Sequence, residues 1–189
     1  YILSNNHVLA RTNLGTAGDP VNQPGMIDQS CQQTGIVANL SDFVPIQISS
    51  KRSFPLNLVD AAIAQVTPGA VRTDGSILDI GTISATTRTA FVGQSVQKSG
   101  RTSGHTTGAV SAIDVTVDVG YSASCGGSST KVARFTNQVT ITPGSFSTGG
   151  DSGSLILENG TVNPADGRPR AVGLLFAGRH PNGVVGGPN

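Results

Sequence analysis

Apolar and polar residues alternate strictly over residues 113–119, where isoleucine or valine stands at each odd position and aspartate or threonine at each even one. A period of two is typical of a β-strand with one buried and one solvated face. A second alternating run covers residues 135–141, and the Gly/Ser-rich segment 120–130 separates it from the first. The two runs predict a β-hairpin with a long tip, so we expect a β protein.

The other apolar runs are short and are separated by turns. No segment keeps a helical period, and 25 glycines and 10 prolines favour many tight turns. We expect an all-β barrel or sandwich in two halves, residues 1–85 and 86–189, with the turn-rich stretch 67–90 as the linker. Further strands are expected at Ile36–Leu40, Val44–Ile48, Val96–Ser99, Leu155–Leu157 and Val172–Phe176.

The net charge and the cysteine spacing argue against several functional classes of protein. The net charge is +1 without a basic stripe, so it gives no support to binding of nucleic acid or an anionic membrane. No apolar run reaches 18 residues, which argues against a transmembrane helix. Cys31 and Cys125 form a disulfide or stay as thiols, and their spacing is not that of metal ligands. The scarcity of lysine and the abundance of Ser, Thr and Gly favour an extracellular protein.

The chain opens on what resembles the end of an apolar strand, and no signal-peptide pattern is present. We therefore interpret the sequence as an interior piece of a longer protein.

Two candidate proton-handling residues lie in the first half. His7 follows an apolar strand end, and histidine readily takes and returns a proton near neutral pH, although a lone histidine is commonly a surface or capping residue. Asp60 stands inside the apolar run 59–64, where a buried carboxylate needs a partner such as a histidine N–H. The alternative is an exposed aspartate at the start of a strand.

The glycine-flanked Ser152 is the strongest chemical signal. The sequence Gly149-Gly150-Asp151-Ser152-Gly153-Ser154 allows a tight turn with positive φ and keeps the space before the hydroxyl open. The backbone N–H groups of Gly150 and Ser152 can then converge on a developing oxyanion, where one donor is worth roughly 3–4 kcal/mol. A Gly/Ser-rich hairpin turn is the simpler alternative.

The three candidates His7, Asp60 and Ser152 together indicate a catalytic arrangement that none of them indicates alone. A serine nucleophile needs a base beside it, and the base needs an orienting acid. Among the unrelated serine hydrolase folds, the chymotrypsin type has the chain order His, Asp, Ser.

The sequence resembles the trypsin/chymotrypsin superfamily, and its N-N-H-V form is closer to the bacterial and Deg-type members than to the digestive ones. The matching segments are S-N-N-H-V at 4–8, D-A-A-I-A at 60–64, S-G-R-T-S-G-H-T-T-G-A-V at 99–110, G-D-S-G at 150–153 and G-L-L-F-A-G at 173–178. The resemblance implies two antiparallel six-stranded barrels with the site in the cleft between them. The first barrel is expected to be incomplete, because His7 lies so near the start.

The resemblance also implies roles for individual residues. Ser152 is the expected nucleophile, His7 the general base and Asp60 the orienting acid, while Gly150 and Ser152 form the oxyanion hole. Walls of a specificity pocket are expected at Phe146, Ser147 and Thr148, with Phe176, Ala177 and Gly178 opposite. Phe146 stands where an aspartate would select basic side chains, so a small or apolar side chain is expected in the pocket.

The resulting hypothesis is a serine endopeptidase that cleaves protein or peptide substrates through an acyl-enzyme, with no metal or organic cofactor. The alternative is a catalytically silent, protease-like binding or scaffold domain, and a third is a protease that processes only its own precursor. Arg101, His105 and His180 are interpreted as structural or exposed residues.

Overall fold

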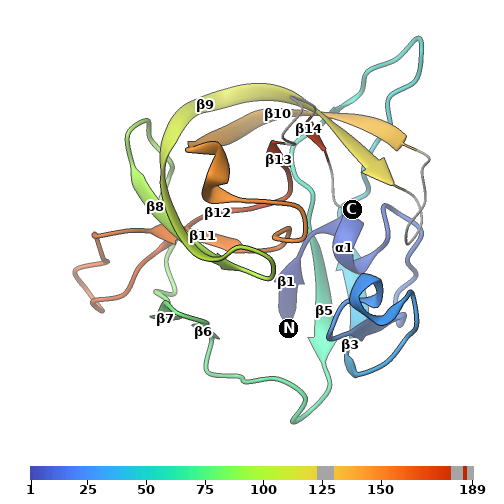
Figure 1. Ribbon diagram of the computed structural model, residues 1–189, viewed down its shortest axis with the longest axis horizontal. Helices are drawn as coiled ribbons and strands as arrows, with labels where there is room; N and C mark the ends of the chain where they lie inside the picture. Colours follow the sequence, from blue (N-terminus) through green and yellow to red (C-terminus); the bar gives the residue numbers. More distant parts are fainter. Residues whose placement is uncertain (123–129, 180–184, 187–189) are drawn as a thin grey trace.

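A computed structural model describes residues 1–122, 130–179 and 185–186 (Figure 1). The expected all-β class is confirmed, and a curled half-barrel sheet fits a chymotrypsin-like β-barrel architecture. Helix is limited, in these residues, to α1 (Asn6–Leu9) and the 3₁₀ helices η1 (Met26–Gln29) and η2 (Gly144–Phe146). None of the helices in the described part of the chain is long and apolar enough to cross a membrane.

The N-terminal sheet is antiparallel and has four strands in the order β1-β5-β3-β2. Its strands are β1 (Ile2–Ser4), β2 (Pro20–Asn22), β3 (Ile36–Phe43) and β5 (Ala62–Val66). The alternation of β3 and β5 turns Ala38, Leu40 and Ala64 inward, and all three are buried. Leu40 and Ala62 pack against Ala10 just after α1, so the helix is fixed to this sheet.

The C-terminal sheet has eight strands, of which six follow the order β12-β11-β8-β9-β10-β4. Its strands are β4 (Leu56–Asn57), β8 (Ser95–Gly100), β9 (Gly104–Ser122), β10 (Thr130–Thr142), β11 (Leu155–Glu158), β12 (Ala171–Leu174), β13 (Gly178–Arg179) and β14 (Val185–Gly186). The expected hairpin is confirmed, because β9 and β10 pair in antiparallel register. In Figure 1, β9 arches across the top of the molecule and curls the sheet into a half-barrel.

The alternation that predicts β9 changes phase in the middle of the strand. Asp114 has a φ of 55°, and the register between β9 and β10 shifts at irregularities around Gln138. Ile113, expected on the buried face, is therefore 41% exposed, whereas Val119 is fully buried. A bulge of this kind re-aims side chains, and here it sets which residues beyond it face the interior.

The segment 44–48 is not the strand that its apolar residues predict. Side-chain amides take the place of a strand partner there. Asn13 donates to and accepts from the backbone of Ile46, and Asn57 does the same for Gln47. These amides satisfy backbone groups of Ile46 and Gln47, so the segment needs no partner strand there.

The two sheets meet along the far end of the β9–β10 hairpin. Ile46, from the N-terminal half, packs in one core cluster with Val119, Tyr121, Ala133 and Phe135 of the hairpin. Strand β4 pairs in parallel with β10, which ties the loop before Asp60 to the C-terminal sheet. The stretch 67–90 carries the small hairpin of β6 (Ser76–Ile77) and β7 (Gly81–Thr82) and an isolated bridge from Thr87 to Ala171.

Candidate active site

His7 and Asp60 form a buried pair at the edge of the N-terminal sheet. His7 lies in α1, and Asp60 lies just before β5. The His7 Nδ1–Asp60 Oδ2 distance is 2.5 Å, and the backbone N–H of His7 donates to Asp60 Oδ1 at 3.2 Å. The exposed fractions are 8% for His7 and 1% for Asp60. A buried aspartate at Nδ1 holds the proton on that nitrogen and leaves Nε2 free to accept one.

Two asparagines hold the chain around His7, and sequence reasoning did not assign them a role. Asn5 Nδ2 donates to the backbone carbonyl of Asp60 at 2.8 Å, and Asn6 Nδ2 donates to that of Val44 at 2.7 Å. Both asparagines are fully buried. Asn5 therefore ties the start of α1 to Asp60 itself, and Asn6 ties the helix to the segment that follows β3.

Tyr121 of β9 is a third member of this cluster that sequence reasoning missed. Its hydroxyl donates to Asp60 Oδ2 at 3.0 Å, and its ring lies 5.5 Å from the His7 ring between centroids. Burial, followed by the negative charge of Asp60 and this hydrogen bond, raises the pKa of Tyr121 far above its usual value. The phenol is therefore a neutral donor at every working pH.

Ser152 lies on a turn held between the two sheets. The neighbouring Gly153 has a φ of 87°, and a Cβ atom there would overlap Ser4 Oγ, so a glycine is needed. Gly153 N–H also donates to the carbonyl of Leu175 at 2.8 Å. The structure thus brings the Ser152 turn against the strand that leads to His7.

No hydrogen bond joins Ser152 to His7, both of which belong to the described residues, and His7 Nε2 is buried without a partner. In a structure without substrate, catalytic hydrogen bonds are often long or poorly aligned, and they tighten in the complex.

The turn before Ser152 presents free backbone donors. Gly150 has a φ of 95°, and a Cβ atom there would overlap Thr102 Oγ1 and the guanidinium of Arg101. Within the described residues, the N–H groups of Gly150 and Ser152 have no protein acceptor. They are available to a negatively charged oxygen, which is what an oxyanion hole requires. Arg101, whose guanidinium lies beside Gly150, is paired with Asp28.

Asp151, between the two free amides, is the anchor of the turn. It is 1% exposed, and it accepts hydrogen bonds from the N–H groups of Thr102, Ser103 and Thr148 and from the Ser103 hydroxyl. Lys98, also fully buried, places Nζ 3.4 Å from Asp151 Oδ2. Burial acts to raise the pKa of Asp151, but the four hydrogen bonds outweigh it and lower the pKa to about 2.

This lowered pKa predicts a loss of stability in acid. A carboxyl group whose pKa is lower in the folded than in the unfolded state stabilises the fold above the unfolded value of 3.8. That contribution is lost as the pH falls from 3.8 towards about 2. We expect the free energy of unfolding to fall more steeply in this window for the parent than for Asp151→Asn, as measured by urea unfolding at several pH values. Parallel curves would contradict this expectation.

The two segments that were expected to wall a specificity pocket lie close together at one point. A Cβ atom at Gly178 would lie 2.9 Å from Ser147 Oγ, so the segments around Ser147 and Gly178 are in contact distance. Phe146 is buried in the core of the C-terminal sheet, and Thr106 Oγ1 donates to its carbonyl at 2.7 Å. The ring of Phe176 is tilted against that of Phe135, with centroids 4.8 Å apart. Thr148 and Ala177 adjoin these residues in the chain.

The remaining candidates lie away from this cluster. His105 is exposed and contacts Gln97 at 2.9 Å, while His180 lies outside the described residues. Cys31 is disulfide-bonded, and Cys125 lies outside the described residues. Residues 1–122, 130–179 and 185–186 contain no cluster of His, Cys, Asp and Glu that could hold a metal ion.

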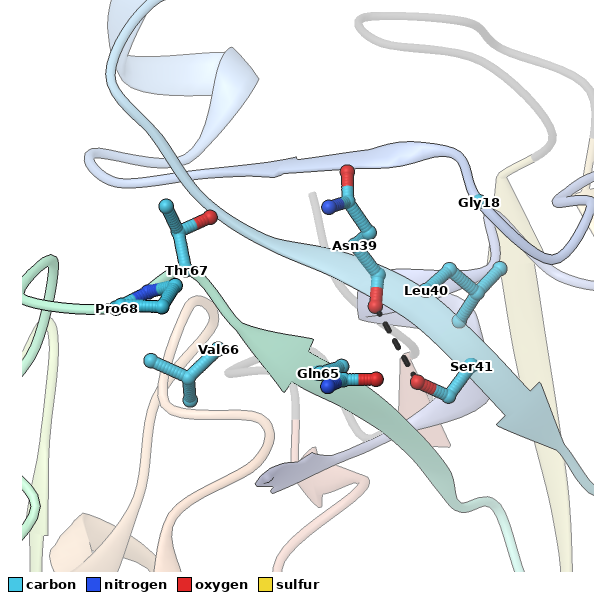
Figure 2. Close-up of a pocket in the computed structure, with 8 residues that line it drawn as sticks. All are labelled: Gly18, Asn39, Leu40, Ser41, Gln65, Val66, Thr67 and Pro68. Carbon is cyan, nitrogen blue, oxygen red and sulfur yellow. Dashed lines mark hydrogen bonds between the residues drawn. The ribbon is translucent and has the colours of Figure 1, made fainter.

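An open hollow lies on the N-terminal sheet between β3 and β5 (Figure 2). None of the candidate site residues lines it. Its lining residues are Gly18, Asn39, Leu40, Ser41, Gln65, Val66, Thr67 and Pro68.

The fold and the site define an all-β protein with a buried histidine–aspartate pair. Residues 48–186 match the family described as the Nal1 C-terminal domain, and the chain belongs to this family.

Two solved structures are similar to the chain. One is a glutamic acid-specific serine protease that uses a histidine triad in substrate binding, with 24% sequence identity, coverage of 89% of this chain and 76% of that one, and a TM-score of 0.47. The other is the chymotrypsin of Cellulomonas bogoriensis, with 20% identity, coverage of 77% and 75%, and a TM-score of 0.38. No curated protein sequence matches the chain.

Proposed function

We propose that the chain is a serine endopeptidase in which His7, Asp60 and Ser152 act as a triad. The observation that carries the proposal is the buried His7–Asp60 pair, with an unpartnered Nε2, beside a turn that presents a glycine-flanked serine. A bare serine hydroxyl is a weak nucleophile, so it needs such a base.

The chemistry follows from these positions. Ser152 Oγ attacks the carbonyl carbon of a peptide bond, and its proton passes to His7 Nε2. The oxyanion of the tetrahedral intermediate accepts hydrogen bonds from the N–H groups of Gly150 and Ser152. His7 then gives the proton to the departing amine, and an acyl-enzyme remains. A water molecule then attacks the acyl-enzyme by the same steps and releases the carboxylic acid product. Throughout, Asp60 stays ionised and stabilises the imidazolium.

Covalent labelling tests this proposal without knowledge of the substrate. We expect a fluorophosphonate probe to add one probe mass to the parent, as measured by intact-protein mass spectrometry. Ser152→Ala should abolish labelling, because it removes the nucleophile. Ser111→Ala is the matched control, since Ser111 is exposed on β9 and should leave labelling unchanged. Labelling that persists in folded Ser152→Ala would contradict the proposal.

The proposal extends to the side chain that the pocket accepts. Ser147 lies close to Gly178, and the buried Phe146 leaves no acidic group at that position, so a small or apolar side chain before the cleaved bond is favoured. Digestion of a peptide mixture by the parent would test this preference, and cleavage mainly after Arg or Lys would contradict it.

An extracellular location is part of the same proposal, because the disulfide at Cys31 is typical of oxidising compartments.

The second candidate is a catalytically silent binding or scaffold domain with the same fold. The missing hydrogen bond between Ser152 and His7 favours it. A folded parent that takes up no probe and cleaves no peptide in the mixture would support this candidate over the first.

A further inference from the structure

We propose that Tyr121 is a positioning residue of the site, which holds the Asp60 carboxylate in place by a hydrogen bond donated from the opposite sheet. This inference rests on the proposed function, because Asp60 acts on the reaction only through His7.

The donors around Asp60 can be counted. Oδ1 accepts the backbone N–H of His7, and Oδ2 accepts both His7 Nδ1–H and the hydroxyl of Tyr121. Within the described residues, Tyr121 is the one donor to this carboxylate from outside His7 itself. Asp60 is 1% exposed, so solvent does not readily replace a lost partner. The hydroxyl therefore fixes the plane of the carboxylate against His7.

The donor is rigidly placed. Tyr121 is 1% exposed and packs in the cluster that joins the two halves. Its ring is tilted against Phe135 at 6.3 Å between centroids, and Phe135 packs against Phe176 in turn. The titratable groups that the structure places in contact with its ring or hydroxyl are His7 and Asp60. A side chain locked by packing in this way is preorganised for its hydrogen bond.

The hydrogen bond also crosses from one half of the protein to the other. His7 and Asp60 belong to the N-terminal sheet and its flanking segments, whereas Tyr121 lies at the end of β9 in the C-terminal sheet. Figure 1 shows β9 reaching over towards α1, the helix that carries His7. The set of hydrogen bonds to the Asp60 carboxylate is thus complete only when the two sheets are packed together. The geometry of His7 therefore depends on that packing.

The Tyr121 hydroxyl changes the negative charge that the Asp60 carboxylate presents to His7. A donor to Oδ2 withdraws negative charge from the carboxylate. Without it, Asp60 attracts the protonated imidazole of His7 more strongly, so the base loses its proton only at higher pH. Removal of the hydroxyl should therefore move the acid limb of the rate profile to higher pH and also slow the reaction, since the carboxylate is less well aligned.

Tyr121→Phe tests this inference through the rate of fluorophosphonate labelling as a function of pH. We expect labelling at neutral pH to be about 10- to 100-fold slower. We expect the acid limb to move up by about 0.5–1 pH unit. Phe135→Leu is the matched control, because it removes core volume beside Tyr121 and leaves the hydroxyl in place. It should lower the urea midpoint without moving the acid limb.

Fluorotyrosine provides a second test that does not depend on the folding of Tyr121→Phe. The chain has two tyrosines, so uniform incorporation of 3-fluorotyrosine into Tyr1→Phe alters Tyr121 alone. A fluorinated phenol is a stronger donor, and the acid limb should then move to lower pH. An unchanged limb in both the phenylalanine and the fluorotyrosine variants would overturn the inference. A parent that takes up no probe would instead count against the proposed function.

Discussion

Asp60→Asn should slow labelling of Ser152 by about 10⁴-fold at neutral pH, the size of effect expected when the histidine of such a triad takes the wrong tautomer. The three donors around this carboxylate explain why an amide fails there. His7 N–H, His7 Nδ1–H and the Tyr121 hydroxyl all need an acceptor, and an amide has only one oxygen. An amide N–H turned towards Nδ1 would place the imidazole proton on Nε2, where it cannot accept one from Ser152.

The rate constant for probe labelling measures this effect, and circular dichroism checks that the variant is folded. Asp114→Asn is the control, because Asp114 is exposed at a bulge with positive φ, a conformation that asparagine also adopts. It should label at the parent rate. Equal labelling of folded Asp60→Asn and the parent would remove Asp60 from the mechanism.

Sequence alone predicted the class of fold and brought His7 and Asp60 forward as candidates. The reason is physical: alternation over residues 113–119 and 135–141 has few interpretations, and a carboxylate in an apolar run needs a partner. The turn at Gly150 and Gly153 could also be predicted, because both positions have a positive φ that favours glycine.

Tyr121 and Lys98 were missed, although a weak signal existed for each. Period-2 alternation places Tyr121 on the face of Val119, and Lys98 on the face of Val96. That pattern shows that these polar side chains point inward, but it does not say which buried carboxylate each one reaches. Their partners lie 61 and 53 residues away in sequence, and only the packing of the sheets and turns brings them together.

The failed strand at residues 44–48 has a related cause. Its apolar residues suggest a sheet, but its backbone groups bond to the side chains of Asn13 and Asn57. Hydrogen bonds to side chains that are distant in the sequence produce no periodic pattern that could predict them. The same segment holds Asn6 through Val44, so the irregular backbone supports the position of α1 and its His7.

Lys98→Met should lower the free energy of unfolding by about 3–5 kcal/mol, which is the usual effect of removing one partner of a buried ion pair. Lys98 Nζ has three partners: Asp151 at 3.4 Å, the Ser103 hydroxyl at 2.5 Å and the Gly104 carbonyl at 3.0 Å. Methionine has a similar length and fills most of the space. It leaves Asp151 ionised and buried, with its four hydrogen bonds but without a cation.

Urea unfolding at neutral pH measures this loss, with Lys51→Met as the control. Lys51 is exposed, so its replacement should change stability by no more than about 0.5 kcal/mol. Because Asp151 lies between the amides of Gly150 and Ser152, we also expect slower labelling of Ser152 in Lys98→Met below its unfolding midpoint. Stability equal to that of the Lys51→Met control would mean that the hydrogen bonds from Thr102, Ser103 and Thr148 hold the buried charge without Lys98.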